Sequence, residues 1–208
     1  MNLHTEILPD QQKRLFDILS EQIWIAPFYL AGGTSLALQI AHRQSVDFDF
    51  FTKNDFDNRD IIEKLRDLGK FELFNEARNT INALLNDVRI SFFKYSYPLL
   101  NSPFRHKNMS VANMEDIALM KLEAISGRGS KKDFIDLYFL LRDFSLSELF
   151  EKYSLKYGIE VSNHYHLLKS LAYFEDAEHE PMPKMFDKMS WEQVKYHIIY
   201  EVKKVRTV

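Results

Sequence analysis

The spacing of apolar residues along the first half of the chain alternates between a helical and an extended period. After Pro9, apolar residues recur every three or four positions, which predicts a helix that ends before Pro27. The apolar run 28–31 then predicts a short buried strand. The residues that the helical spacing places on one face are Leu15, Ile18, Leu19 and Ile23.

A glycine pair and an alternating segment follow this strand. Gly32 and Gly33 permit a tight turn and a close backbone approach, because neither residue has a Cβ atom. We expect Thr34 or Ser35 to cap the short helix that comes next. Residues 46–51 alternate in polarity and predict a second strand. Its faces carry Asp47 and Asp49 on one side, and Val46, Phe48 and Phe50 on the other.

The pattern up to Pro98 predicts a small α/β domain. Residues 57–68 form a charged amphipathic segment that Gly69 ends, which is typical of a helix. Three extended segments follow, with turn signals at 78–79 and 86–87 between them. Helix and strand in alternation, followed by a cluster of strands, favour a mixed sheet, which we expect to end near Pro98. The three segments are 70–77, 80–85 and 88–95.

From Asn113 onward the spacing is helical. The expected helices are 113–127, 131–144 with Ser130 as its cap, 147–157, 162–174 and 190–205. The sequence therefore predicts an α/β (α+β) fold with two parts. We expect a mixed-sheet core at residues 1–105 and a helical C-terminal region at residues 106–208 that packs on this core.

The composition and net charge of the chain limit the kinds of function that it can have. The 208 residues carry a net charge of −3 at pH 7, with 46% hydrophobic and 27% charged residues, which is typical of a globular protein. Because the charges nearly balance, any contact with nucleic acid must be local. The absence of cysteine excludes disulfides and thiolate metal sites. The chain shows neither an apolar run of roughly 18 residues nor a signal-peptide pattern, so we expect a cytoplasmic protein without membrane contact.

The glycine pair and the two aspartates indicate phosphate chemistry. Carboxylates at positions i and i+2 of a strand point the same way, and Mg²⁺ prefers such oxygen ligands while sharing its shell with water and substrate phosphates. Backbone amides at the glycine turn and at the start of the following helix form an anion cradle. A phosphate could bridge this cradle and the metal. The alternative is a plain tight turn followed by a half-solvated edge strand.

Four further segments complete a pattern with the glycine pair. They are HRQSVDFD at 42–49, YPLL at 97–100, EDIALMK at 115–121 and KDFIDL at 132–137. Together with Gly32-Gly33-Thr34-Ser35, they resemble the AbiEii/AbiGii toxin family of nucleotidyltransferase-like proteins, within the polymerase-β-like nucleotidyltransferase superfamily. The resemblance covers roughly residues 28–142 and implies a nucleotidyltransferase-type fold.

The resemblance implies an enzyme that transfers an NMP group from an NTP to an acceptor hydroxyl of tRNA or protein. Mg²⁺ would be its cofactor. Asp47 and Asp49 would be the ligands of a site that holds one or two of these ions. Its implied role is that of the toxin of a bacterial toxin–antitoxin or phage-defence pair, with a cognate antitoxin as a protein partner. The residues implied to bind the nucleotide are Gly32, Gly33, Thr34 and Ser35, with Arg43 and Ser45 close enough in sequence to orient a carboxylate or a phosphate.

A second group of candidate residues lies on the later helices. Lys121 falls within an apolar stripe, and the resemblance implies that it helps to hold the nucleotide phosphates. The alternative is a lysine whose stem covers apolar surface while its charge stays in water. Asp133 and Asp136 are one helical turn apart and can face a common point. The resemblance implies that Lys132, Asp133 and the catalytic Asp136 close the other side of the site, in a cleft between the two parts.

One carboxylate of the superfamily pattern is missing. We expect it on the strand 88–95, beside the first two acids, and Ser91 occupies that position. A neutral hydroxyl binds a divalent ion less well and is not a strong base. Either Asp133 or Asp136 replaces the missing acid, or the chain is a degenerate nucleotidyltransferase fold that binds a nucleotide or a protein without turnover.

The loop 127–132 is basic and rich in glycine. Most loops of this kind are solvated connections between helices. Beside an acidic site, however, such a loop could steer a phosphate-rich acceptor such as RNA.

Overall fold

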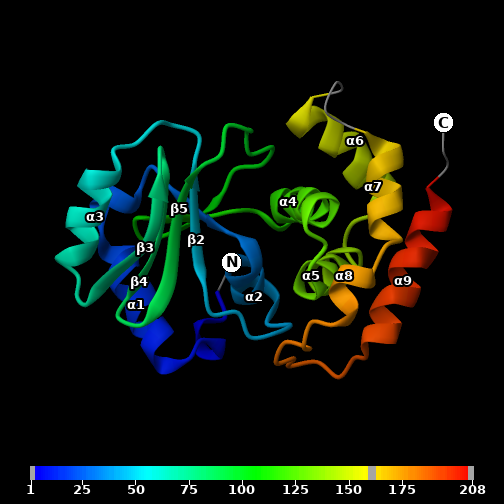
Figure 1. Cartoon of the computed structure of the whole chain (residues 1–208), viewed down its shortest axis with the longest axis horizontal. Coiled ribbons are helices and arrows are strands. Elements are labelled where there is room, and N and C mark those ends of the chain that lie inside the picture. The colour runs from blue at the N-terminus through cyan, green and yellow to red at the C-terminus, as the bar shows by residue number, and fades with distance from the viewer. Residues whose placement is uncertain (1–2, 159–162, 206–208) are drawn as a thin grey trace. The chain divides into compact units, whose positions relative to one another are not determined.

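A mixed sheet organises the first of two compact units, Met1–Asn113, and helices make up the second, Met114–Val208 (Figure 1). The computed structural model describes residues 3–158 and 163–205. A mixed-sheet part followed by a helical part is the fold class that the sequence predicts. Within the described ranges, no helix combines the length and the apolar character needed to cross a membrane.

Seven strands form the sheet of the first unit. They are β1 (Tyr29–Ala31), β2 (Phe48–Thr52), β3 (Phe71–Ala77), β4 (Thr80–Leu85), β5 (Val88–Lys94), β6 (Phe104–His106) and β7 (Met109–Val111), in the spatial order β3-β4-β5-β2-β1-β7-β6. The β1–β7 and β2–β5 pairs are parallel, and the other neighbours are antiparallel. The sheet is therefore mixed, as predicted.

The turn between β4 and β5 fixes the register of the strands beside the candidate site. Asn86 and Asp87 have φ values of 50° and 60°. A two-residue hairpin turn of this kind needs left-handed backbone at both positions, which Asn and Asp tolerate better than most residues. This turn pairs Ser91 of β5 with Asn82 of β4, and the parallel pairing of β5 with β2 places Ser91 beside Asp49.

Two helices cover one face of this sheet. The apolar faces of α1 (Asp10–Glu21) and α3 (Asn58–Arg66) pack into a core with Phe48, Phe50 and Phe92. Burying each such side chain stabilises the fold by about 1.5–3 kcal/mol. Because side chains alternate across a strand, Phe48 and Phe50 in this core direct Asp49 to the other face. Two short 3-10 helices, η1 (Thr5–Ile7) and η2 (Ile23–Ile25), flank α1.

The helix after the glycine pair, α2 (Gly32–Ile40), begins earlier than predicted. The expectation that Thr34 or Ser35 caps it is wrong, because Gly32 is its first residue and Ala31 is at the cap position. Gly32 has a φ of +72°, a left-handed conformation that a residue without Cβ adopts at little cost. Thr34 and Ser35 lie inside the helix and are buried.

The predicted face assignments fail at three apolar residues. Val46 lies outside β2 and is 50% exposed, because β2 begins only at Phe48, so that Asp47 precedes the strand. Ile18 of α1 is 38% exposed, and Ile23 is 81% exposed because α1 ends at Glu21 and the chain turns before it.

The sheet does not end near Pro98, contrary to expectation. Two strands of three residues each, β6 and β7, lie beyond it, and β7 pairs with the central strand β1. The amide of Ala112 also donates to the carbonyl of Leu30, at 2.9 Å. Residues up to 112 therefore complete the sheet of the first unit.

The second unit consists of α4 (Met114–Gly127), α5 (Lys131–Leu140), α6 (Leu146–Tyr157), α7 (His164–Leu171), α8 (Glu175–Glu178) and α9 (Trp191–Lys204). Ser145 and Ser190 form capping boxes that begin α6 and α9. The fully buried pair Lys156–Asp116, at 2.7 Å, joins α6 to α4. The short helix α8 was not predicted, and the predicted helix start at Ser162 lies outside the described residues.

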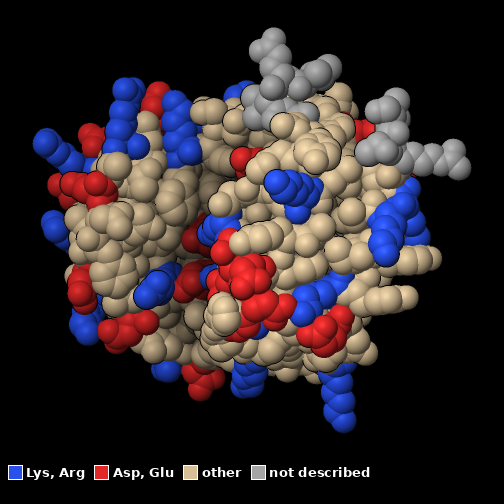
Figure 2. Space-filling model, turned by 45° about the vertical axis from the view of Figure 1, so that its right-hand side comes forward, with Lys and Arg blue, Asp and Glu red and all other residues tan. Residues whose placement is uncertain are grey.

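The surface carries both signs of charge. On the face drawn in Figure 2, Lys and Arg side chains stand singly or in small groups among Asp and Glu side chains. This distribution agrees with the net charge of −3. Long-range attraction of a polyanion is therefore weak on this face, and recognition of one must come from local groups.

Candidate functional site

The start of α2 provides a group of backbone amides close to a carboxylate. Ala31 at the cap position has no side-chain acceptor for the first-turn N–H groups. A Cβ atom on Gly32 would lie 3.2 Å from Oδ2 of Asp49, so the glycine lets this carboxylate approach the helix start. The amides and the positive end of the helix dipole make this point suitable for an anion such as a phosphate.

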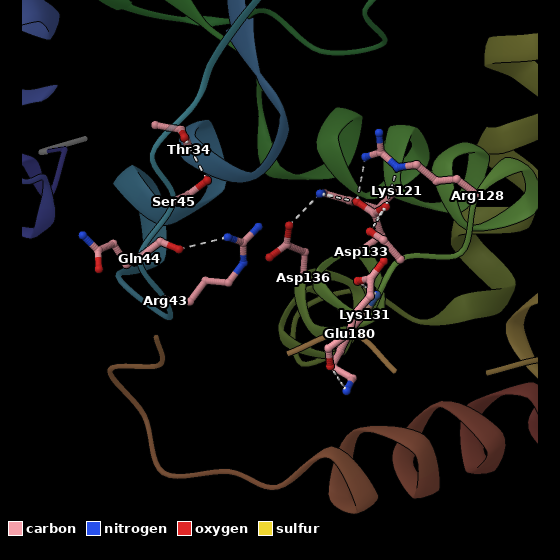
Figure 3. A network of polar contacts seen from close by, with 11 residues as sticks. Thr34, Arg43, Gln44, Ser45, Lys121, Arg128, Lys131, Asp133, Asp136 and Glu180 are labelled. Atoms are coloured by element: carbon pink, nitrogen blue, oxygen red, sulfur yellow. Dashed lines mark hydrogen bonds and ion pairs between the residues drawn. The ribbon is translucent and has the colours of Figure 1, made fainter. Parts of the chain in front are cut away.

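Polar side chains gather around the first turn of α2 (Figure 3). A Cβ atom on Gly33 would overlap Nη2 of Arg43, whose side chain is buried and donates from Nη1 to the carbonyl of Gln44 at 3.0 Å. The Thr34 hydroxyl donates to the main-chain carbonyl of Asp47 and lies 2.9 Å from the Ser45 hydroxyl. Gly33, Thr34, Arg43 and Ser45, which the sequence singled out, are thus neighbours in the fold.

Two partly exposed aspartates and a serine lie next to this turn. Asp47 precedes β2 and Asp49 lies within it, and neither is fully buried. Ser91 stands opposite Asp49 on β5, at the position where the sequence lacks the third acid. Within residues 3–158 and 163–205, no cluster of three His, Cys, Asp or Glu side chains could hold a metal ion. Two carboxylates beside a phosphate cradle still fit Mg²⁺, which takes few protein ligands when phosphates and water supply the rest.

In the second unit, a lysine and two aspartates form a buried cluster between α4 and α5 (Figure 3). Lys121 Nζ lies 2.8 Å from Oδ1 of Asp133 and 2.6 Å from Oδ2 of Asp136. The lysine side chain is 6% exposed and both carboxylates are fully buried. Asp133 and Asp136 therefore face a common point, as their spacing predicts. The ammonium group of Lys121 does not reach into water, so the alternative of a lysine with a solvated charge is wrong.

Two residues of the α4–α5 connection also contact Asp133. Arg128 donates from Nε to Oδ2 at 2.8 Å and from Nη2 to Oδ1 at 3.2 Å. Ser130 stands at the cap position of α5, as predicted, and its hydroxyl donates to Oδ2 at 2.7 Å. Burial alone would raise the pKa of Asp133, but the charge of Lys121 and the hydrogen bonds and charge of Arg128 outweigh it and hold this pKa well below its ordinary value.

The two lysines at the start of α5 differ in burial. Lys132, which the sequence singled out, is exposed. Lys131 is buried: its backbone amide donates to Oε2 of Glu180 at 2.8 Å, and its ammonium group donates to the carbonyls of Glu178 and Glu180. The loop 127–132 is therefore less available as a basic surface than its composition suggests, because Arg128 and Lys131 have partners within the unit.

A comparison with protein families shows which family the chain belongs to. The model of the nucleotidyl transferase AbiEii toxin family, described as a type IV toxin–antitoxin system, matches residues 13–101 and 94–206. The chain belongs to the AbiEii family. The "uncharacterized protein aq_aa25" of Aquifex aeolicus (strain VF5) is 40% identical over 183 residues, which is 85% of this chain and 86% of that protein.

Solved structures share the fold of this chain over nearly its whole length. JHP933 from Helicobacter pylori superposes with a TM-score of 0.59 at 16% identity, covering 94% of this chain and 92% of that one. The nucleotidyltransferase toxin MenT4 from Mycobacterium tuberculosis H37Rv superposes with a TM-score of 0.58 at 14% identity, covering 95% and 87% of the two chains. At these identities the likeness concerns the fold alone.

Sequence reasoning missed several polar residues of this AbiEii chain. Ser130 was expected only to cap a helix, although it also contacts Asp133, three residues later. Arg128 was placed in a loop without a partner, and nothing in the local sequence indicated its pairing. Glu180 lies on a segment after α8 and reaches the start of α5 only through the tertiary fold.

Proposed function

We propose that this protein is a Mg²⁺-dependent nucleotidyltransferase that transfers an NMP group from an NTP to an acceptor hydroxyl of RNA or protein. The observation that carries the proposal is the close approach of the Asp49 carboxylate to the first turn of α2, which Gly32 permits. This arrangement offers metal ligands and a phosphate cradle within one small region. Membership of a nucleotidyltransferase family supports the same reaction type.

In the proposed reaction, the residues around α2 hold the triphosphate. The first-turn amides of Gly33, Thr34 and Ser35 donate to the β- and γ-phosphates, and Asp47 and Asp49 hold Mg²⁺. The acceptor oxygen forms a bond to the α-phosphorus, the bond to pyrophosphate breaks, and the hydroxyl proton is released. A Mg²⁺ ion, which Asp47 and Asp49 would hold, would supply positive charge to offset that of the phosphates.

Arg43 and Ser45 act in this proposal as positioning residues. Ser45 contacts Thr34, whose hydroxyl also holds the carbonyl of Asp47, so that the loop before β2 is tied to the first turn of α2. The guanidinium of Arg43 lies against Gly33 and adds positive charge beside the cradle.

We further propose that the buried cluster of the second unit takes part in the transfer. Lys121 and Asp136 are the proposed catalytic residues of this unit, with Lys132 and Asp133 in nucleotide binding. The contacts of Asp133 with Lys121, Arg128 and Ser130 support a positioning role in which it fixes the lysine. In the cell, the protein would be the toxin of a toxin–antitoxin or phage-defence pair in the cytoplasm, restrained by a cognate antitoxin.

The second candidate function is nucleotide binding without turnover. Ser91 opposite Asp49 favours it, because a hydroxyl replaces the carboxylate that would complete a three-acid metal site. The two candidates differ in one measurable property, which is covalent transfer.

The test measures transfer of label from α-labelled NTPs to bacterial RNA and protein with Mg²⁺. We expect wild type to label an acceptor and Asp47→Asn to reduce labelling at least about a hundredfold, because charge stabilisation in the transition state is lost. Asp17→Asn on α1 is the matched control, since it removes one exposed carboxylate of the same unit, and we expect it to label like wild type. Equal labelling by wild type and Asp47→Asn, or none with any of the four NTPs, contradicts the enzymatic function.

A further inference from the structure

A hollow of about 290 Å³ lies within the helical unit, where the end of α4 meets α7. We name it the α7 hollow and define it by the polar and aromatic residues that line it: Ser126, Arg128, His166, Lys169, Tyr173 and Asp176. Its volume is at the lower end of the range for ligand sites, roughly 300–1,000 Å³. A hollow of this size suits a single small unit of a larger ligand.

The lining residues of α7 form one stripe. His166, Lys169 and Tyr173 follow one another at three- and four-residue spacing, which places them along one face of the helix and its last turn. The amide of Tyr173 donates to the carbonyl of Ser170 at 3.1 Å, so the turn continues past the end of α7. His166 lies 3.4 Å from the carbonyl of Ser126 and joins this stripe to the end of α4.

This stripe combines a cation with an open aromatic face. Tyr173 is 54% exposed and lines the hollow, so its ring is accessible to a ligand seated there. Lys169 is exposed and has no acidic partner within ion-pair distance among the described residues. A cation beside an exposed aromatic ring is the combination with which proteins bind single-stranded nucleic acid without duplex pairing.

The charges in the α7 hollow give a bound nucleotide one orientation. Asp176 and the negative end of the α7 dipole lie near Tyr173, where they repel an anion. Lys169 and His166 lie one and two turns back along the helix. This arrangement suits a phosphate at Lys169 and the base of the same nucleotide on Tyr173, while the His166 ring donates from Nε2 to the carbonyl of Ser126.

Arg128 links the α7 hollow to the buried cluster of Lys121, Asp133 and Asp136. Arg128 lines the hollow with a side chain that is 64% exposed, while its Nε and Nη2 atoms hold Asp133. A strand seated in the hollow thus lies against a residue that contacts the cluster directly. Because the net charge of the chain is −3, such a strand would have to be recognised by a local group of this kind.

We propose that the α7 hollow binds one nucleotide of a single-stranded RNA segment, with the phosphate at Lys169 and the base on Tyr173. That this RNA is the acceptor of the transfer rests on the proposed function. Binding to the hollow itself needs neither NTP nor Mg²⁺, so it can be measured separately from transfer.

The test is fluorescence anisotropy of a short fluorescein-labelled single-stranded RNA of mixed sequence, without NTP or Mg²⁺. Tyr173→Ala should weaken binding about tenfold, whereas Tyr173→Phe keeps the ring and should bind like wild type. Lys169→Gln should lower the slope of log affinity against log salt by about 0.7, the value for one phosphate contact on a single strand. Tyr165→Ala on the same helix, at a 76% exposed tyrosine outside the hollow, and Lys188→Gln should change neither quantity.

Three outcomes would overturn this inference: no RNA binding by wild type, equal binding by wild type and Tyr173→Ala, or competition by an acidic peptide that matches competition by RNA. If wild type transfers label to RNA while Tyr173→Ala and Lys169→Gln bind RNA normally, the inference fails and the proposed function stands. If the variants lose RNA binding but no NTP is ever transferred, the hollow stands as an RNA site and the proposed function fails.

Discussion

The two aspartate pairs of this chain carry the same charge in opposite surroundings. Asp47 and Asp49 keep part of their surface in solvent, beside the backbone amides at the start of α2. Asp133 and Asp136 are fully buried, and a lysine lies within 2.8 Å of both. The first pair is open to an added cation, whereas the second already has cations supplied by the chain.

This difference separates two uses of a carboxylate. A buried charge is tolerated only when it is paired and hydrogen-bonded, so removal of its partner is costly to the fold. A partly exposed carboxylate adds little to stability and is retained for what it binds. Stability measurements on matched variants therefore show how much each aspartate pair contributes to the fold, apart from any role in the reaction.

The largest expected effect is on the buried pair. Lys121→Met removes the ammonium group that pairs with both buried carboxylates, and it should lower the free energy of unfolding by about 3–5 kcal/mol. Asp47→Asn should change it by at most about 0.5 kcal/mol. Urea unfolding followed by Trp191 fluorescence in a Trp24→Phe background reports the helical unit and measures Lys121→Met, and Trp24 fluorescence in a Trp191→Phe background reports the first unit and measures Asp47→Asn, because the chain has one tryptophan in each unit.

A double variant tests whether this loss comes from the ion pair. Adding Asp136→Asn to Lys121→Met removes the charge of a carboxylate that has lost its lysine partner. The double variant should therefore be less destabilised than the sum of the two single changes, with a coupling energy of about 0.5–3 kcal/mol. If the losses in the free energy of unfolding of the two single variants simply add, Lys121 and Asp136 do not stabilise each other. That result would contradict the view that Lys121 compensates the charge of the buried aspartate pair.

A smaller effect is expected at the start of α2. Gly32→Ala places a Cβ at a φ of +72° and 3.2 Å from Oδ2 of Asp49, so it should cost about 1–2 kcal/mol and weaken NTP binding severalfold. Gly127→Ala is the matched control, because a Cβ there meets nothing within 4 Å. At that helical position alanine should be neutral or stabilising by up to about 1 kcal/mol. Isothermal titration with a nonhydrolysable NTP and urea unfolding give the two quantities.

The most gradual effect is the pH dependence from Asp133. Its pKa is lowered in the folded state, so its stabilising contribution is complete above the ordinary aspartate pKa of about 4. That contribution is lost as the pH falls from there toward the lowered pKa, by up to about 1.4 kcal/mol per pH unit. The stability difference between wild type and Asp133→Asn should therefore shrink as the pH falls below about 4, measured through Trp191 fluorescence. A constant difference over this range would contradict the role of the Asp133 charge.

Local spacing predicted those parts of the site that lie within one element. Asp133 and Asp136 are one turn apart on α5, so their common direction follows from helix geometry alone. The expectation that Ser91 stands beside the first two acids came from the family resemblance, and the register pairs it with Asp49. The functional roles of these residues rest on the family resemblance and stay predictions.

What could not be predicted depends on contacts between segments far apart in the sequence. The strands β6 and β7 have three residues each, too few to show a period, and β7 is placed by its pairing with β1. Arg128 and Glu180 reach their partners only through the path of the chain in the helical unit. The early start of α2 depends on the left-handed backbone of Gly32, which is compatible with either a turn or a helix start.

The parallel pairing of β1 with β7 has a consequence for how the chain is made. Tyr29 and Leu30 of β1 pair with Ser110 and Val111 of β7. One edge of the buried strand β1 therefore has no pairing strand until residues much later in the chain have been translated. Until those residues emerge from the ribosome, the nascent first unit carries an open hydrophobic edge of the kind that recruits other strands. The short stretch after Pro98 closes that edge, which makes the segment from 104 to 112 the step that completes this unit during synthesis.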